Sequence, residues 1–242
     1  MSKNILVTGV SQGLGLAIAR AVLNQGWTVS GVSRHLSDEY SMLQREHGDR
    51  ARFHPFDLNR TDDVKAELFD KFLPFELPLH GYVNNAAVAY DDIVTNLDAT
   101  RLRAMYEVNV FAPMMITRYA IRHMLFNRIT GSIVHISSIS VHTGYKGLAM
   151  YASTKGALEA FSKNTAREWG ERSIRSNCVV AGFIETAMSG SLSAEQKQRI
   201  YQRTALKEAT RIESVAATVV FLLGEGAASV TGQNIFVDSG TI

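Results

Sequence analysis

Short apolar runs alternate with longer amphipathic segments along almost the whole of this 242-residue chain. The short runs are typical of buried strands, and the longer segments repeat apolar residues at helical spacing. Strands that alternate with helices form a parallel sheet, because each connection crosses back over the sheet. The predicted strands are 4–8, 27–32, 80–84, 132–136, 177–180 and 234–237, with one more ending at Asp57, and the predicted helices are 14–23, 62–72, 100–126, 151–169 and 211–223. The expected fold class is α/β, a single doubly wound parallel sheet with helices on both faces.

Two local features refine this pattern. Thr61 is expected to cap the helix 62–72, and Pro113 is expected to kink the helix 100–126. The chain is long enough for one or two domains, at roughly 150 residues each. Since no linker, charge block or repeat divides it, we expect one domain over 1–242.

Composition excludes several classes of function. The net charge of +2 does not indicate a nucleic-acid or anionic-membrane partner. Cys178 is the single cysteine, which excludes a disulfide framework and a Cys-rich zinc site, and we expect no metal. We recognise neither a signal peptide nor an apolar run long enough for a bilayer, so a cytoplasmic protein is expected.

A glycine-rich turn follows the first predicted strand. Gly9, Gly13 and Gly15 permit positive φ angles and close approach of the backbone to a ligand. The next helix offers free N–H groups and the positive end of its dipole, which suit a pyrophosphate. A tight turn with close helix–strand packing could use the same glycines. The position directly after the first strand favours a dinucleotide site.

The end of the second strand bears on which nucleotide would bind. An acidic residue there would hold the adenosine ribose by its hydroxyls, but the chain has Ser33 and Arg34. A guanidinium suits a 2′-phosphate, although a solvated surface arginine is the alternative. Asp57 could accept a hydrogen bond from adenine or cap the turn that follows it.

Tyr151 and Lys155 stand four residues apart on a predicted helix and therefore share one of its faces. A phenol ordinarily titrates near pH ~10, and a neighbouring ammonium would lower its pKa. Ser138 lies just beyond the predicted strand 132–136, at the sheet edge where ligands bind. Its hydroxyl could hold a carbonyl oxygen while Tyr151 donates a proton. Hydride transfer to a ketone requires such a set of groups.

Taken together, these motifs resemble those of the short-chain dehydrogenase/reductase family. They are Thr8-Gly9-x-x-x-Gly13-x-Gly15, Asn84-Asn85-Ala86, Asn109, Ser138 and Tyr151-x-x-x-Lys155. Within that family, the stretches 133–155, 182–186 and 231–233 are most similar to the 3-oxoacyl-[acyl-carrier-protein] reductases. The resemblance covers essentially the whole chain. It implies a Rossmann-type fold of about seven strands, NADP(H) or possibly NAD(H) as cofactor, and a homotetramer.

The resemblance also implies roles for individual residues. Tyr151 would be the general acid, Lys155 would bind the nicotinamide ribose and lower the pKa of Tyr151, and Ser138 would orient the carbonyl. Asn109 would hold a water that links Lys155 to solvent. The implied cofactor-binding residues are Gly9, Ser11, Gln12, Gly13, Leu14, Gly15, Ser33, Arg34, Asp57, Leu58, Asn85, Ala86, Ala87, Tyr151, Lys155, Gly182, Ile184 and Thr186. As alternatives, Asn109 would only fix a helix kink and Ser138 would only end a strand.

Departures from the family pattern affect the cofactor site and spare the catalytic groups. Ala87 and Ala181 replace a glycine and a proline of the usual pattern, and Ser239 replaces a glycine near the C-terminus. Gln12 stands where a basic residue is often found in NADP-dependent members. The expectation of NADP(H) therefore depends mainly on Arg34.

The substrate is less constrained by the sequence. We expect a lid at about 186–205, whose helical part 194–203 carries Lys197, Arg199 and Arg203. Arg172 matches a basic position that receives the acidic carrier protein in the similar reductases, and Arg128 lies beside another. A solvated basic face is the alternative. His142 and Tyr145 are candidates for shaping the pocket.

Three functions are open from the sequence. The first is NADPH-dependent reduction of a 3-oxoacyl thioester on acyl carrier protein. The second is action on a small-molecule alcohol, sugar or polyketide ketone. The third is nucleotide sensing without catalysis, against which the complete set Asn109, Ser138, Tyr151 and Lys155 argues.

Overall fold

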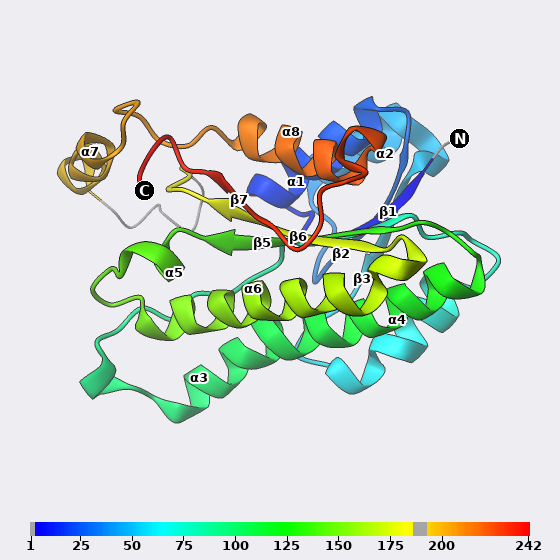
Figure 1. Ribbon diagram of the computed structural model, residues 1–242, viewed down its shortest axis with the longest axis horizontal. Coiled ribbons are helices and arrows are strands. Elements are labelled where there is room, and N and C mark those ends of the chain that lie inside the picture. The colour runs from blue at the N-terminus through cyan, green and yellow to red at the C-terminus, as the bar shows by residue number, and fades with distance from the viewer. Residues whose placement is uncertain (1–2, 186–192) are drawn as a thin grey trace.

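A single parallel sheet organises the chain, which the computed structural model describes over residues 3–185 and 193–242 (Figure 1). Within those residues the sheet has seven strands in the order β3-β2-β1-β4-β5-β6-β7. Their bounds are β1 Asn4–Thr8, β2 Thr28–Ser33, β3 Ala51–Pro55, β4 Gly81–Asn84, β5 Ser132–Ser138, β6 Arg175–Ala181 and β7 Asn234–Val237. Every neighbouring pair is parallel. The predicted fold class is confirmed.

Helices cover both faces of the sheet. On one face lie α1 (Gly13–Asn24), α2 (Asp38–His47) and α8 (Ile212–Leu223), and on the other lie α3 (Ala99–Tyr106), α4 (Ala112–Phe126) and α6 (Ala149–Trp169) (Figure 1). A π-helix over Val64–Phe72 also packs on the second face, and α5 (Ser140–Thr143) and α7 (Ala194–Arg203) lie at one end. Each face buries its own apolar cluster. Across the described ranges, no helix combines the length and apolar character that crossing a bilayer requires.

Helix α2 was not predicted because it is polar and buries only Tyr40 and Leu43. Its start is nevertheless defined by Ser37, whose Oγ accepts a hydrogen bond from the backbone N–H of Tyr40 at 3.2 Å. The expected cap at Thr61 is wrong. The hydroxyl of Thr61 donates to Glu107 at 2.5 Å, and the helix that follows begins at Val64.

The predicted helix 100–126 is interrupted by a π-helical segment, Glu107–Phe111, between α3 and α4. Pro113 lies just beyond it, in the first turn of α4. Since proline has no N–H to donate to the carbonyl four residues earlier, regular α-helix is disfavoured here. The irregularity expected at Pro113 thus falls on the preceding turn, which contains Asn109.

The strand order determines where a ligand can bind. β1 has β2 on one side and β4 on the other, so the connections after these strands depart in opposite directions. In open parallel sheets, ligands bind at the carboxyl ends of the strands beside such a switch point. Thr8, Asn84 and Ser138 all end strands at this edge.

Close packing at the start of α1 predicts a large effect of Gly15→Ala. An added Cβ would overlap the carbonyl oxygen of Gly9 and the side chain of Asn85. We expect a loss of more than about 2 kcal/mol in the free energy of unfolding, measured by chemical denaturation. Gly170→Ala is the matched control, because its Cβ would meet no atom within 4 Å. Equal stability of the two variants would contradict this packing.

Candidate active site

The glycine-rich turn has the geometry of a phosphate cradle. Gly9 has φ +76°, Gly13 has φ +55°, and the N–H of Gly9 donates to the carbonyl of Val32 at 2.7 Å. Helix α1 begins without a side-chain cap on Gln12 and without an acidic residue in its first turn. Its first N–H groups and the positive end of its dipole therefore face the strand edge, where a pyrophosphate fits. Ser11 and Leu14, the remaining predicted residues of this turn, are partly exposed beside it.

Thr8 connects this turn to the loop that follows β4. Its Oγ1 accepts hydrogen bonds from the backbone N–H groups of Asn85 and Ala86, both at 3.2 Å. The Asn85 side chain donates in return to the carbonyl of Thr8 at 2.9 Å. Asn85, Ala86 and the partly exposed Ala87 are thus held beside the cradle. The roles predicted for these residues stay predictions, but their placement suits an adenosine-side wall.

At the end of β2, Ser33 accepts a hydrogen bond from the N–H of Ser11 at 3.1 Å, and Arg34 is exposed. Asp57 accepts from the backbone N–H and the side chain of Asn59, at 3.0 and 2.9 Å. These bonds, with Arg34 nearby, lower the pKa of Asp57. The carboxylate of Asp57 therefore caps the turn that follows it, which is the second of the two roles considered from the sequence. It also lies close to Arg34. Leu58 is buried beneath it.

The predicted catalytic residues converge on β5 and α6. Lys155 is 2% exposed, and its Nζ donates to the carbonyl of Ile136 at 2.8 Å. The same Nζ lies 5.7 Å from the centre of the Tyr151 ring. Ser138 stands two residues further along β5, and its Oγ accepts from the N–H and the hydroxyl of Ser140 at 3.2 and 3.0 Å.

Asn109 is buried in the π-helical segment and bonds in two directions. Its Oδ1 accepts from the N–H of Val88 and its Nδ2 donates to the carbonyl of the same residue, both at 2.9 Å. Nδ2 also donates to Thr154 Oγ1 at 3.1 Å. The side chain thus ties the loop after β4 to α6, next to Lys155. The water-holding role implied by the resemblance stays a prediction.

Burial dominates the protonation of the central pair. It raises the pKa of Tyr151 to about 12, with a smaller contribution from Asp91, and it lowers the pKa of Lys155 to about 8. The expected lowering of the Tyr151 pKa by Lys155 is therefore absent from this geometry. The reason is that the ammonium is directed at the Ile136 carbonyl while the phenol loses solvation.

The residues predicted to line the nicotinamide side follow the end of β6. An added Cβ on Gly182 would come within 2.6 Å of the backbone of Asp238, so a larger residue does not fit. Ala181 accepts a backbone hydrogen bond from Ile139 at 3.0 Å, which keeps β5 and β6 together just beyond Ser138. Ile184 is partly buried against the core. Thr186 and the first part of the predicted lid, 186–192, lie outside the described residues, and α7 spans the predicted helical part 194–203.

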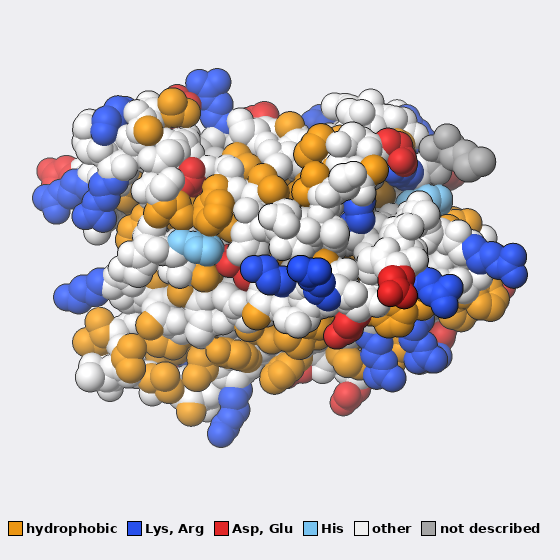
Figure 2. Space-filling view, viewed as in Figure 1, with side chains coloured by type: hydrophobic (Ala, Val, Ile, Leu, Met, Phe, Trp, Pro, Cys, Tyr) orange, Lys and Arg blue, Asp and Glu red, His pale blue; other side chains and the backbone are white. Residues whose placement is uncertain are grey.

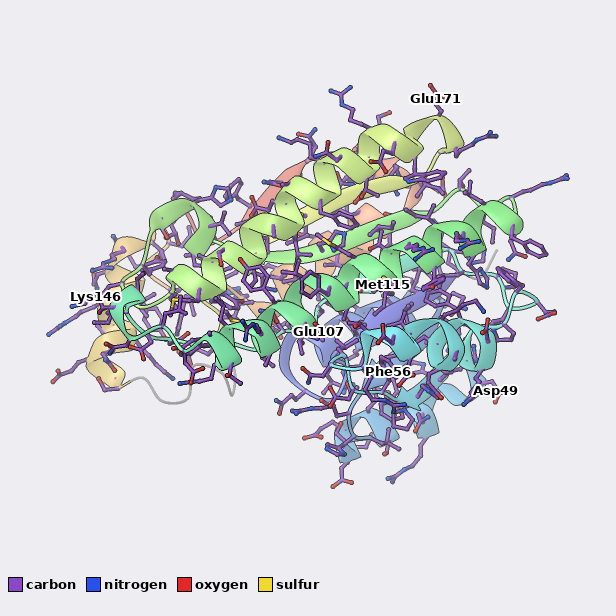
Figure 3. All side chains as sticks on the ribbon, turned by 90° about the horizontal axis from the view of Figure 1, so that it is seen from below. Asp49, Phe56, Glu107, Met115, Lys146 and Glu171 are labelled. Atoms are coloured by element: carbon purple, nitrogen blue, oxygen red, sulfur yellow. The ribbon has the colours of Figure 1, made fainter. Side chains whose placement is uncertain are left out.

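Of the proposed substrate and partner residues, only some lie near this edge. His142 and Tyr145 follow Ser138, on α5 and just after it. Arg128 and Arg172 precede β5 and β6, so they lie at the amino ends of the strands, about 20 Å from Ser138 at ~3.3 Å per residue. In Figure 3, Lys146, which follows Tyr145, and Glu171, which precedes Arg172, lie at opposite ends of the molecule. In this subunit, neither arginine is beside the catalytic residues.

Charged side chains are unevenly spread over the surface. On the face shown in Figure 2, Lys and Arg side chains gather over α7 and at the opposite end of the molecule, while hydrophobic side chains gather over α3. Within residues 3–185 and 193–242, no group of three or more His, Cys, Asp or Glu side chains is arranged to hold a metal ion.

Comparisons with known proteins identify the family of this chain. The family model described as "Enoyl-(Acyl carrier protein) reductase" matches residues 9–241. The chain belongs to the short-chain dehydrogenase/reductase family. It is 35% identical to nodulation protein G of Rhizobium sp. (strain N33), over 98% of this chain and 96% of that protein. It is 29% identical to the 3-oxoacyl-[acyl-carrier-protein] reductase FabG of Chlamydia trachomatis, over 99% and 97%.

The structural similarity of this family member is equally extensive. A gluconate 5-dehydrogenase from Burkholderia cenocepacia, solved with NADP and tartrate, superposes with a TM-score of 0.93. It covers 100% of this chain and 96% of its own, at 24% identity, so it shows the shared fold. The chain is thus an oxidoreductase of a family that uses a nicotinamide cofactor.

Sequence reasoning missed the residues that hold the site together. Thr154 accepts a hydrogen bond from Asn109 and donates one to the carbonyl of Tyr151. The negative charge of Asp91 contributes to the raised pKa of Tyr151. Glu159 accepts hydrogen bonds from three other elements of the fold. Thr8, which links the glycine-rich turn to the loop after β4, could have been found from the sequence because it is the first residue of the glycine motif.

Burial of the Lys155 ammonium predicts a pH dependence of stability. Between about pH 8 and its ordinary value of 10.5, the unfolded chain keeps a proton that the folded protein has lost. Stability contributed by Lys155 therefore increases as pH rises through this window. Relative to Lys155→Met, the wild-type free energy of unfolding should increase by on the order of 1–3 kcal/mol between pH 7 and 10, measured by urea denaturation. The exposed Lys163→Met is the control, and equal profiles for both variants would refute the argument.

Proposed function

We propose that this family member is an NADPH-dependent reductase of 3-oxoacyl thioesters carried on acyl carrier protein. The observation that carries the proposal is the convergence of Tyr151, Lys155 and Ser138 at the carboxyl edge of the sheet, beside the glycine cradle. Such a site binds a ketone and delivers a proton where a dinucleotide can approach. The similarity to FabG supports the thioester as substrate.

The reduction divides between the cofactor and the chain's own residues. NADPH, when bound, supplies the hydride that adds to the carbonyl carbon. The Ser138 hydroxyl donates a hydrogen bond to the carbonyl oxygen and orients it. Tyr151 delivers the proton that converts this oxygen to a hydroxyl. Lys155, whose ammonium is held by the Ile136 carbonyl one turn of α6 after Tyr151, would bind the nicotinamide ribose.

Cofactor choice rests on Arg34. It is exposed at the end of β2 beside the Asp57 turn, so its guanidinium is free to reach a 2′-phosphate there. The structurally similar gluconate 5-dehydrogenase was solved with NADP, which supports the same choice. NAD(H) is the alternative cofactor.

The partner would be an acidic carrier, and the assembly a homotetramer. Arg199 and Arg203 are exposed on α7, four residues apart and on one face, close to the end of the molecule that holds the site. Arg128 and Arg172 stay candidates for carrier contacts only if another subunit brings them to the site. Exposed apolar side chains such as Phe111, at 50% exposure, support pairing of subunits along the α3–α4 surface.

A small-molecule ketone or sugar is the second candidate substrate. The similarity to a gluconate 5-dehydrogenase favours it, as does the Asp91 carboxylate near Tyr151, which could accept a hydrogen bond from a substrate hydroxyl.

Replacing Arg34 tests the cofactor. Because charge-assisted hydrogen bonds contribute about 1.5–3 kcal/mol, Arg34→Ala should raise the KM for NADPH about 10- to 100-fold and leave the KM for NADH within about twofold. Initial rates with each cofactor measure this, with the exposed Arg167→Ala as control. An equal increase for both cofactors would contradict the 2′-phosphate contact.

A single NADPH-oxidation assay distinguishes the two substrate classes. We expect turnover of acetoacetyl thioesters, faster on acyl carrier protein than on small thiols, and slower turnover of free ketones and keto-sugars. Tyr151→Phe should lower kcat by about 10²–10⁴-fold on any substrate, because it removes the general acid. Turnover of keto-sugars alone would favour the second candidate, and full activity of Tyr151→Phe would exclude the mechanism.

A further inference from the structure

Glu159 is a buried carboxylate close to the site that the reaction described above does not use. It lies on α6, one turn after Lys155, and is 8% exposed. Its oxygens accept hydrogen bonds from Ser137 Oγ of β5, from His142 Nε2 of α5 at 3.1 Å, and from Asn234 Nδ2 of β7 at 2.6 Å. Burial of a charge is costly unless donors surround it, and here three elements of the fold supply them.

Two bonds from one face of α6 hold the end of β5. Lys155 donates to the Ile136 carbonyl, and Glu159 accepts from the side chain of the next residue, Ser137. The residue after that is Ser138. Because Tyr151, Lys155 and Glu159 are spaced four residues apart, they follow one face of the helix. The two bonds therefore set the position of Tyr151 on α6 relative to Ser138 on β5.

The third contact extends this hold to the segment beyond Ser138. His142 bonds Glu159 from α5, and the first residue of α5, Ser140, donates through its N–H and hydroxyl to Ser138 Oγ. His142 also stacks edge-on against Phe236 of β7, with ring centres 4.9 Å apart. The Ser138 hydroxyl is thus oriented by a turn that Glu159 keeps in place.

We infer that Glu159 is a positioning residue for reduction, which sets the separation and orientation of Ser138 and Tyr151 without touching the substrate. The inference rests on the proposed function for its assay, while its structural part stands on the contacts of Glu159 alone. Displacement of reacting groups by about 1 Å can cost about 100-fold in rate. Loss of this carboxylate should therefore affect kcat far more than cofactor binding.

The test compares Glu159→Gln with a matched variant on the next turn of α6. Ser162 also bonds α6 to the sheet, through Ser176 of β6 at 2.8 Å, but away from the end of β5. We expect Glu159→Gln to lower kcat by about 10- to 100-fold and to leave the KM for NADPH within about twofold. Ser162→Ala should keep both kcat and the KM for NADPH within about twofold of the wild-type values. Equal losses of kcat in the two variants, or none in Glu159→Gln, would overturn the inference.

A rescue variant and a measurement without substrate complete the test. In Glu159→Gln the amide faces the amide of Asn234, so adding Asn234→Asp restores a carboxylate–amide pair and should recover part of kcat. Hydrogen exchange of the amides of residues 137–143 should be about tenfold faster in Glu159→Gln and unchanged in Ser162→Ala. Unchanged exchange in Glu159→Gln would overturn the inference, whatever the substrate. Failure of the wild-type protein to reduce any of the proposed thioesters would refute the proposed function and leave the exchange test intact.

Discussion

The burial of Lys155 against the end of β5 is the contact on which the active site depends. Removing the Lys155 ammonium from water destabilises its charged form, which lowers the pKa of Lys155 to about 8. The hydrogen bond to the Ile136 carbonyl offsets part of this destabilisation and fixes α6 over β5. This contact, together with the hydrogen bond from Ser137 to Glu159, positions Tyr151 on α6 relative to Ser138 on β5.

The π-helical segment between α3 and α4 also supports the region around Lys155. Pro113 cannot donate to the carbonyl four residues earlier, and the turn before it widens into a π-helix. This turn carries Asn109, whose amide reaches both the loop after β4 and Thr154 on α6. A local defect in one helix thus becomes a connection between three elements around Lys155.

Prediction from sequence succeeded where local chemistry decides structure. The alternating apolar runs predicted the parallel sheet, and the glycines at 9, 13 and 15 predicted the turn after its first strand. It failed for α2, whose few buried residues leave no strong periodic pattern, and for Thr61, whose hydroxyl is engaged by Glu107 from another helix. The candidate catalytic residues were predicted because their spacing repeats a family motif. Glu159 was missed because a buried carboxylate has no local signature and shows its role only through Ser137, His142 and Asn234.

The sequence by itself determined the fold class and the glycine-rich turn after the first strand, and it predicted the candidate catalytic groups. These depend on backbone freedom at glycine, on the period of apolar residues and on spacing within one helix. Only the tertiary structure decided the protonation of Tyr151 and Lys155, because burial is created by elements distant in sequence. Only the tertiary structure also revealed Glu159 as a shared acceptor, because its donors Ser137, His142 and Asn234 come from three separate elements. The positions of Arg128 and Arg172 before their strands follow from the sequence, and in a parallel sheet such positions lie at the end opposite Ser138.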